Sequence, residues 1–499
     1  MSSSSEVDAN RQRFRNFMCV WLLQAVDALD ASLVSPSMSE YIRSLDGSRA
    51  VYGQAISLFF VGRILGLPLF GLLADYVSFE SAFKSSLLLG VVGGLVYALA
   101  GLFKALWFIL LSRFILGAST GVISAAMAFA GAAAAGEQTK FSGITVLVYN
   151  VVTVVAPALG SLLTVLPHEG TAFNSYTYCG YALMVFNVIS LLIHVKFFQE
   201  PDRSHLEIDG IESSLLGGPA QDAELGEALE GKKSILGKIC FGVRSLVYEL
   251  VDMAKVLRQT GAWVTFVTSS QNSFNQLVVQ WGLPIVTYEY FGWGQRMNGV
   301  LLMGTSVVGL VGLPLLLRNL HHLSDRSVFV SFQTFVGISL LLFSIYAGCS
   351  HSHQLTPVIL CITLGLWGFG TFGQVPGNMG LFSKLLGARK QGKFQAILFM
   401  TMSLARVIAG SLIGVSDGPA GTCTIYAAAF VFWILQFAFY LPMWPHFHPD
   451  LLKPPHAHRH HHLSNTEDSN IADASERNNE QDEDSQEEEE EERQYVAID

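Results

Sequence analysis

Long apolar runs constrain the fold of this chain more than any other feature of its sequence. A helix that crosses the hydrocarbon core of a bilayer needs about 20 largely apolar residues. The 499-residue chain contains about twelve such runs, by the same length rule. They cover 16–38, 52–74, 83–104, 106–130, 142–165, 178–198, 262–285, 297–318, 327–348, 356–379, 394–415 and 422–444. Because the bilayer core offers no water to backbone N–H and C=O groups, each run should form a helix. The sequence therefore predicts an all-α membrane protein with about twelve transmembrane helices.

Composition excludes several other classes of protein. The chain is 51% hydrophobic and only 14% charged, whereas soluble domains carry about 25% charged residues. The six cysteines have no metal-ligand spacing, so we expect packing residues and neither a disulfide framework nor a metal site. The sequence also lacks a phosphate-binding loop and a nucleophile elbow, which argues against an enzyme, a cofactor and ATP-driven transport.

A polar stretch between the sixth and seventh runs divides the chain into two six-helix halves. Within this linker, 235–258 has the apolar spacing of an amphipathic helix, either on the membrane surface or capping the bundle. The predicted parts are an N-terminal segment (1–15), an N-terminal half (16–199), the linker (200–260), a C-terminal half (261–445) and a tail (446–499). Lys and Arg are concentrated before the first run, in the linker and between runs ten and eleven, so both termini are predicted to be cytosolic.

The tail is predicted to be disordered from its composition, a His-rich patch followed by an acidic run. We interpret the histidines as a pH-sensitive polar linker rather than a metal site. The chain ends with Tyr495 and Ile498 in a Tyr-x-x-apolar arrangement. This has the form of a sorting signal that clathrin adaptors read on cytosolic tails.

Five charged residues lie inside the apolar runs: Asp27, Asp30, Arg63, Arg113 and Arg406. An ionisable side chain at bilayer depth costs roughly 2.5–3.5 kcal/mol on insertion scales, so such residues usually serve a function. They predict a membrane protein that handles ions or charged solutes.

Several short motifs resemble those of the major facilitator superfamily, in the expected order along the chain. Gly71 and Asp75 stand at the end of the second run with the spacing of the loop signature of that family. Arg113 and Gly117 resemble its fourth-span signature, and Pro157 and Gly160 resemble its fifth-span pattern. The resemblance implies two nested six-helix halves around a site at the membrane midplane. The basic residues that normally follow the aspartate are missing, which puts the gating role of this loop in doubt.

The second half resembles the lysosomal branch of this superfamily, which includes the membrane protein of neuronal ceroid lipofuscinosis and, more distantly, the membrane halves of vacuolar phosphate transporters. The matching residues are Gly370–Pro376, Ser383, Lys384, Gly387, Gln391, Gly392, Ala405 and Arg406. This resemblance implies an endolysosomal or vacuolar membrane and anion movement. One departure is Met127, which stands where that branch carries a second arginine.

In the implied fold, the first and fourth spans line the cavity together. Asp27 and Arg113 lie at nearly the same depth when counted from the span ends, so we predict that they pair. Asp30 shares a helix face with Asp27. The pair is either a proton site, tuned by burial and by neighbouring charges, or a static ion pair between two helices.

The second and eleventh spans face each other across the two halves in this fold. Arg63 and Arg406 lie mid-span in these runs, so an anion between them would relieve their repulsion. The alternative is that each binds backbone carbonyl groups. The seventh run carries a polar stripe that we predict to be a solute-facing wall, with Gln271, Asn272, Asn275 and Gln276 at its centre. Pro376 lies in a glycine-rich part of the tenth run, which predicts a bent or unwound helix beside the cavity.

The resulting hypothesis is a transporter of the endolysosomal or vacuolar membrane that moves a small anion, such as chloride, phosphate or a carboxylate. Its expected partners are the lipid bilayer, the anion, protons as a coupling ion, and an adaptor bound to the tail. The alternatives are a chloride-channel-like pore, a carrier of a neutral solute such as a sugar, and a transport-dead scaffold or receptor.

Overall fold

The computed structural model divides into two units, Met1–Phe447 and His448–Asp499, and every residue described below belongs to the first unit. The described residues are 2–133, 138–163, 166, 170, 173–200, 255, 257–258, 262–319, 325–348, 357–386, 391–416 and 418–443. The predicted amphipathic helix at 235–258 lies almost wholly outside these residues, as do most of the linker and the tail with Tyr495 and Ile498.

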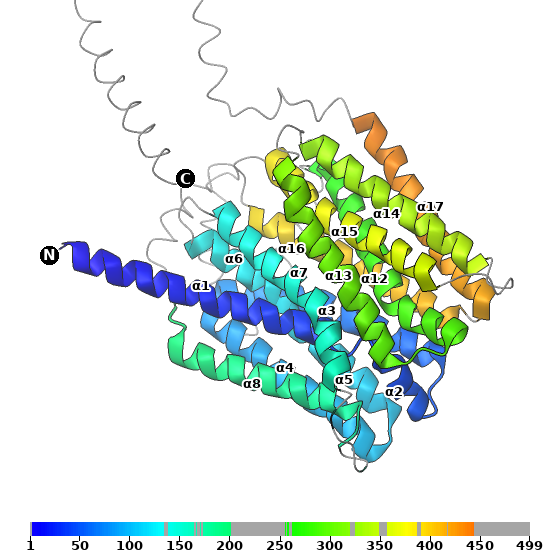
Figure 1. Cartoon of the computed structure of the whole chain (residues 1–499). Coiled ribbons are helices and arrows are strands. Elements are labelled where there is room, and N and C mark those ends of the chain that lie inside the picture. The colour runs from blue at the N-terminus through cyan, green and yellow to red at the C-terminus, as the bar shows by residue number, and fades with distance from the viewer. Residues whose placement is uncertain are drawn as a thin grey trace, which may run out of the picture. The chain divides into compact units, whose positions relative to one another are not determined.

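All twelve predicted spans are helical, and the described residues contain no strand. The N-terminal half contains α1 (Ser2–Ser32), α2 (Met38–Ser44), α3 (Arg49–Tyr76), α4 (Phe79–Phe103), α5 (Leu106–Ser119), η1 (Thr120–Val122), α6 (Ile123–Ala133), α7 (Gln138–Leu163) and α8 (Thr177–Phe197). The C-terminal half contains α12 (Trp263–Phe291), α13 (Gln295–Asn319), α14 (Asp325–Gly348), α15 (Pro357–Leu386), α16 (Gln391–Val415) and α17 (Gly418–Met443). The predicted all-α fold with two six-helix halves is therefore confirmed (Figure 1).

Six helical segments of the described chain are long and apolar enough to cross a membrane, judged by length and composition. They are Arg49–Tyr76, Phe79–Phe103, Leu106–Ala130, Thr177–Phe197, Gln395–Val415 and Gly421–Tyr440. Large apolar side chains remain exposed along these helices, for example Leu65, Leu88 and Leu192. Exposed apolar side chains on a many-helix bundle are what a lipid environment requires.

The first and fourth spans differ from their predicted form. The first helix ends at Ser32 rather than at residue 38, because Pro36 has no N–H to continue the hydrogen-bond ladder, and a short helix, α2, then follows. The fourth span is helical but interrupted at η1. Ser119 and Thr120 donate hydroxyl hydrogen bonds to carbonyl groups of the preceding turn, at 2.7 and 2.8 Å. Such side-chain bonds commonly bend a helix.

The two halves meet along α3 and α16, which run antiparallel to each other. Near one end, a Cβ atom on Gly53 would lie 2.4 Å from the Cα atom of Gly414, so only glycine permits this approach. One turn further along, the Ser57 and Ser411 hydroxyl oxygens are 3.1 Å apart. These contacts place mid-helix residues of α3 and α16 side by side.

Polar contacts join the halves at the end of the bundle where α2 lies, and we call this set of contacts the α2-end junction. Glu40 accepts a hydrogen bond from the backbone N–H of Gln295 at 2.9 Å, at the start of α13. Arg49 forms an ion pair with Glu289 at 3.1 Å. Tyr52 donates to the carbonyl of Trp281 at 2.8 Å. The junction thus combines charges, a helix N-terminus and buried hydroxyl bonds.

The opposite end has a different chemistry in the described residues. Leu67, Ile123 and Met127 of the N-terminal half form one buried apolar cluster with Phe399 of α16. Met127, which replaces the second arginine expected from the lysosomal branch, is a packing residue in this cluster. Asp75 is exposed at this end. The halves therefore meet here through apolar packing.

The loop after Asp75 is held within its own half. The Glu200 carboxylate accepts hydrogen bonds from the backbone N–H groups of Phe79 and Glu80, at 3.0 and 2.9 Å, and so caps the start of α4. A carboxylate at a helix N-terminus interacts favourably with the helix dipole. Where the family pattern has basic residues, this chain fixes the loop through an acidic residue that follows α8.

Glu40 gives the α2-end junction a predicted pH dependence. Burial raises the pKa of Glu40, while the hydrogen bond from Gln295 and the charge of Arg43 lower it by less. Among the described residues, Tyr176 at the start of α8 also faces Glu40. The pKa of Glu40 is higher when the α2-end junction is closed than when it is open, because closure buries the carboxyl group. Protonation of Glu40 therefore favours the closed junction. The closed population should therefore grow as pH falls through the raised pKa toward the ordinary value of about 4.

Distances between spin labels at Ser44 and Met297, measured by electron paramagnetic resonance, report the population with a closed junction. Glu40→Gln should remove the pH dependence, whereas Glu289→Gln serves as the control and should retain it. A wild-type distance distribution that does not change between pH 4 and pH 8 would contradict the prediction.

Candidate solute site

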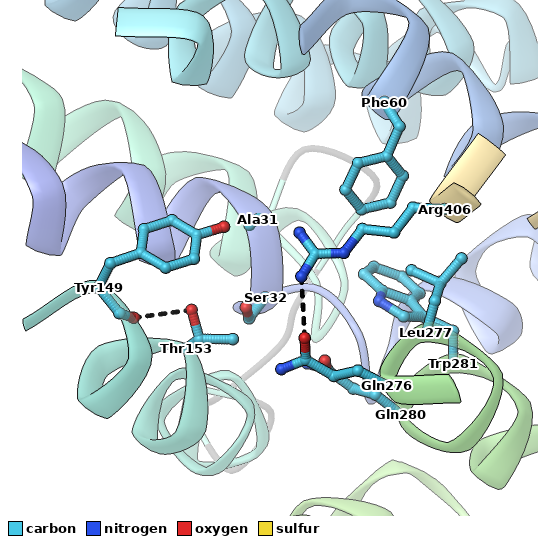
Figure 2. Close-up of a pocket in the computed structure, with 10 residues that line it drawn as sticks. All are labelled: Ala31, Ser32, Phe60, Tyr149, Thr153, Gln276, Leu277, Gln280, Trp281 and Arg406. Atoms are coloured by element: carbon cyan, nitrogen blue, oxygen red, sulfur yellow. Dashed lines mark hydrogen bonds between the residues drawn. The ribbon is translucent and has the colours of Figure 1, made fainter. Parts of the chain in front are cut away.

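A cavity lies between the two halves near the middle of the helices. Its lining comes from five helices: Ala31 and Ser32 of α1, Phe60 of α3, Tyr149 and Thr153 of α7, Gln276, Leu277, Gln280 and Trp281 of α12, and Arg406 of α16 (Figure 2). The cavity volume is about 20 Å³. One water needs roughly 10–15 Å³ on this scale, so the cavity in this conformation accommodates one or two waters.

Arg406 is the charged side chain among the ten lining residues. Its Nη2 atom donates to Oε1 of Gln276 at 2.8 Å (Figure 2). Its guanidinium carbon lies 5.4 Å from the centroid of the Phe60 ring. The guanidinium group therefore spans the boundary between the halves, with an amide of α12 on one side and an aromatic ring of α3 on the other.

Arg63 reaches the same region from α3. It is buried, and its Nη1 atom donates to the hydroxyl of Tyr149 at 2.8 Å. Tyr149 also interacts electrostatically with Arg406, and Arg406 with Arg63. The predicted meeting of Arg63 and Arg406 across the halves is therefore present in the structure, with the Tyr149 hydroxyl between them.

The predicted pair of Asp27 and Arg113 is wrong. Arg113 donates from Nη1 to the backbone carbonyl of Asp30 at 3.1 Å, and the charged partner of Asp27 is Arg63. Asp30 follows Asp27 on the same continuous helix, about 4.5 Å, or three residues, further along its axis. Depth counted from the span ends does not resolve two positions this close, and it is Asp30 that Arg113 meets.

Asp27 and Asp30 are both buried and have separate partners. Asp27 accepts a hydrogen bond from Nε2 of Gln24 at 3.3 Å. Asp30 accepts from Nδ2 of Asn187 in α8, at 3.0 and 3.3 Å to its two oxygens. Asn187 was not predicted, although an amide inside the sixth apolar run is a usable signal. Asp30 thus links α1 to α8, while Asp27 faces Arg63.

Arg113 is fully buried between aromatic rings. Its guanidinium carbon lies 4.2 Å from the Phe59 centroid and 5.4 Å from the Trp281 centroid. Its Nε and Nη2 atoms make no hydrogen bond within the described part of the chain. Cation–π contacts with Phe59 of one half and Trp281 of the other therefore stabilise it together with the charge of Asp30.

The predicted polar stripe of α12 is divided in this conformation between residues that line the cavity and residues that do not. Gln276 and Gln280 line the cavity, whereas Gln271 and Asn275 are not among its lining residues and are fully buried. Asn272 accepts a hydrogen bond from Gln374 of α15. A helix turns about 100° per residue, so polar residues at neighbouring positions face different partners.

The motif residues have mainly packing roles. A Cβ atom on Gly117 would lie 1.8 Å from the carbonyl oxygen of Phe59, and one on Gly160 would lie 2.0 Å from that of Leu33. Gly71 is less constrained, since its nearest contact would be 3.6 Å from Ser124. Pro157 is buried within α7. The predicted unwinding at Pro376 is not seen, because α15 is continuous from Pro357 to Leu386.

Comparisons with known proteins agree with this architecture. A family model described as Major Facilitator Superfamily matches residues 20–410. The xylose transporter XylE from E. coli, in a partially occluded inward-open conformation, is similar with a TM-score of 0.61 and 14% identity, over 87% of this chain and 99% of that one. A D-xylose-proton symporter is similar with a TM-score of 0.64 and 13% identity, over 86% and 97%. No curated protein matches the chain significantly.

The close approach at Gly117 generates a prediction about stability. Gly117→Ala should destabilise the fold by about 1–3 kcal/mol, because the added methyl group meets a backbone carbonyl that cannot move away. Thermal unfolding of the purified protein in detergent measures the effect as a lower Tm.

Gly71→Ala is the matched control, since the added methyl group makes only an ordinary contact there. Equal Tm values for the two variants would show that α3 and α5 are not packed as closely as described.

Proposed function

The chain belongs to the major facilitator superfamily, and is therefore a multi-pass membrane transporter rather than an enzyme. We propose that it carries a small anion across the membrane, bound at the site between the two halves. At 13–14% identity, the similarity to the xylose carriers shows the fold alone. The solute has to be inferred from the charges at the site.

The meeting of Arg63 and Arg406 is the observation that supports an anion. Their guanidinium groups come from opposite halves and both interact with Tyr149, while Asp27 is a carboxylate that interacts electrostatically with Arg63. When all are ionised, two positive charges face one negative charge. The remaining positive charge, in a site screened from water, favours an anionic solute such as chloride, phosphate or a carboxylate.

Asp27 supplies a route for proton coupling in this proposal. It is buried and interacts with Arg63. Protonation of Asp27 would remove the negative charge and leave both guanidinium groups to the solute. A proton and an anion would then each raise the affinity for the other, because coupling between two binding events is reciprocal. Such coupling favours symport of an anion with a proton.

We propose the endolysosomal or vacuolar membrane as the location, with both termini cytosolic. Support comes from the resemblance of the second half to the lysosomal branch, the Tyr495–Ile498 signal and the Lys and Arg distribution. Co-localisation of the tagged full chain with an endolysosomal marker checks this location, and a uniform plasma-membrane signal would contradict it.

Anion flux in proteoliposomes tests the proposed function. Wild-type protein should carry chloride, inorganic phosphate or lactate with saturable kinetics, and Arg406→Ala should lower the flux at least tenfold because it removes one of the two cationic partners. Arg258→Ala is the matched control, since Arg258 is exposed at the end of the linker.

In the same assay, Asp27→Asn should abolish the acceleration of anion flux that an inward proton gradient gives.

Equal flux for wild type and Arg406→Ala would refute the anion site. Current that follows voltage alone would replace the carrier with a chloride pore, and xylose flux without anion flux would replace it with a neutral-solute carrier.

A further inference from the structure

Tyr149 occupies the position between the two arginines where the proposed anion would bind. Its hydroxyl oxygen accepts the hydrogen bond from Arg63 at 2.8 Å and lies within electrostatic range of Arg406. The residue belongs to α7, and the side chain is 9% exposed and lines the cavity (Figure 2). It was not predicted, because a tyrosine in an apolar run carries no charge signal.

We propose that Tyr149 is an internal ligand of the two arginines and that the transported anion binds by displacing its hydroxyl. The inference rests on the proposed function, which supplies the anion. It adds the residue against which the solute competes and the movement that must accompany binding.

The electrostatics of the site favour such an exchange. Two guanidinium groups that approach each other inside a membrane repel unless an acceptor lies between them. The phenol supplies an oxygen with only a partial negative charge. A guanidinium group attracts an oxygen or ion with a full negative charge more strongly than it attracts a neutral hydroxyl. An anion that reaches the site therefore replaces the phenol as the preferred acceptor.

The available space favours the exchange. The cavity accommodates one or two waters at about 20 Å³. A phosphate or a carboxylate solute is larger, so a lining side chain that turns away makes room for it. Tyr149 is suited to this, because its ring is held by non-covalent contacts with Arg63, whose guanidinium carbon lies 5.3 Å from the ring centroid.

The backbone near Tyr149 is anchored independently of the side chain. The Tyr149 carbonyl accepts a hydrogen bond from the Thr153 hydroxyl at 2.8 Å (Figure 2). α7 also contacts the C-terminal half through Ser161, which donates to the Gln295 carbonyl at 3.2 Å. The phenol can therefore turn by rotation about its side-chain bonds while α7 stays in place.

Direct binding of chloride, inorganic phosphate and lactate to the purified full chain tests the proposal. Tyr149→Phe removes the competing hydroxyl and keeps the ring, so the Kd of the anion that binds wild-type protein should fall about five- to tenfold. A residue that instead contacts the bound solute through its hydroxyl would give a higher Kd when mutated. An unchanged or higher Kd in Tyr149→Phe overturns the internal-ligand role.

Tyr97→Phe is the matched control. It removes the hydroxyl of another buried tyrosine, one that is not among the cavity-lining residues, and should leave the Kd unchanged. A parallel decrease in Kd for Tyr97→Phe would attribute the effect to general loosening of the fold and overturn the proposal.

A measurement on wild-type protein keeps the proposal testable if Tyr149→Phe does not fold. Nitration of Tyr149 by tetranitromethane, quantified by mass spectrometry, should increase when the anion binds and frees the phenol. Unchanged or decreased nitration overturns the exchange. Failure of the proposed function has a different signature, since no anion would then bind either wild-type protein or Tyr149→Phe, and Arg406→Ala would change nothing.

Discussion

Buried guanidinium groups are the constraint on which the rest of this structure depends. Arg63 and Arg113 are buried within membrane-spanning helices, and Arg406 is half-buried where it lines the cavity between the halves. Each must therefore find partners inside the protein. The partners differ: a tyrosine hydroxyl for Arg63, a backbone carbonyl and two aromatic rings for Arg113, and a glutamine amide for Arg406. The helix arrangement has to satisfy all three at once.

These partners connect packing to function. Arg113 contacts rings from both halves, and its position depends on the approach of α5 to α3 at Gly117 and Phe59. Arg63 and Arg406 meet only because α3 and α16 are in contact along their length. A movement of one half relative to the other therefore changes the surroundings of all three cations together. Coupling between solute binding and helix movement is a direct outcome of this arrangement.

The sequence predicted the fold well because the membrane imposes a simple rule on helix length. Every predicted span is largely helical, and two of the charges inside apolar runs, Arg63 and Arg406, interact electrostatically across the halves. Finer geometry did not follow from the sequence. The pairing of Asp27 was wrong because Asp27 and Asp30 are only three residues apart on one helix, and residue counts from span ends cannot decide which of the two meets Arg113. Tyr149 was missed because an uncharged residue becomes important only through the neighbours that the fold supplies.

The two ends of the bundle hold the halves together by forces that respond oppositely to temperature. In the described residues, the α2 end uses an ion pair, a capped helix and hydroxyl bonds, whereas the other end uses the apolar contact of Leu67, Ile123, Met127 and Phe399. Apolar contacts gain strength on warming near room temperature, because their driving force there is mostly entropic. Hydrogen bonds and ion pairs carry a larger enthalpic part. Heat should therefore favour conformations closed at the apolar end, so that the direction in which the site faces becomes a function of temperature as well as of solute.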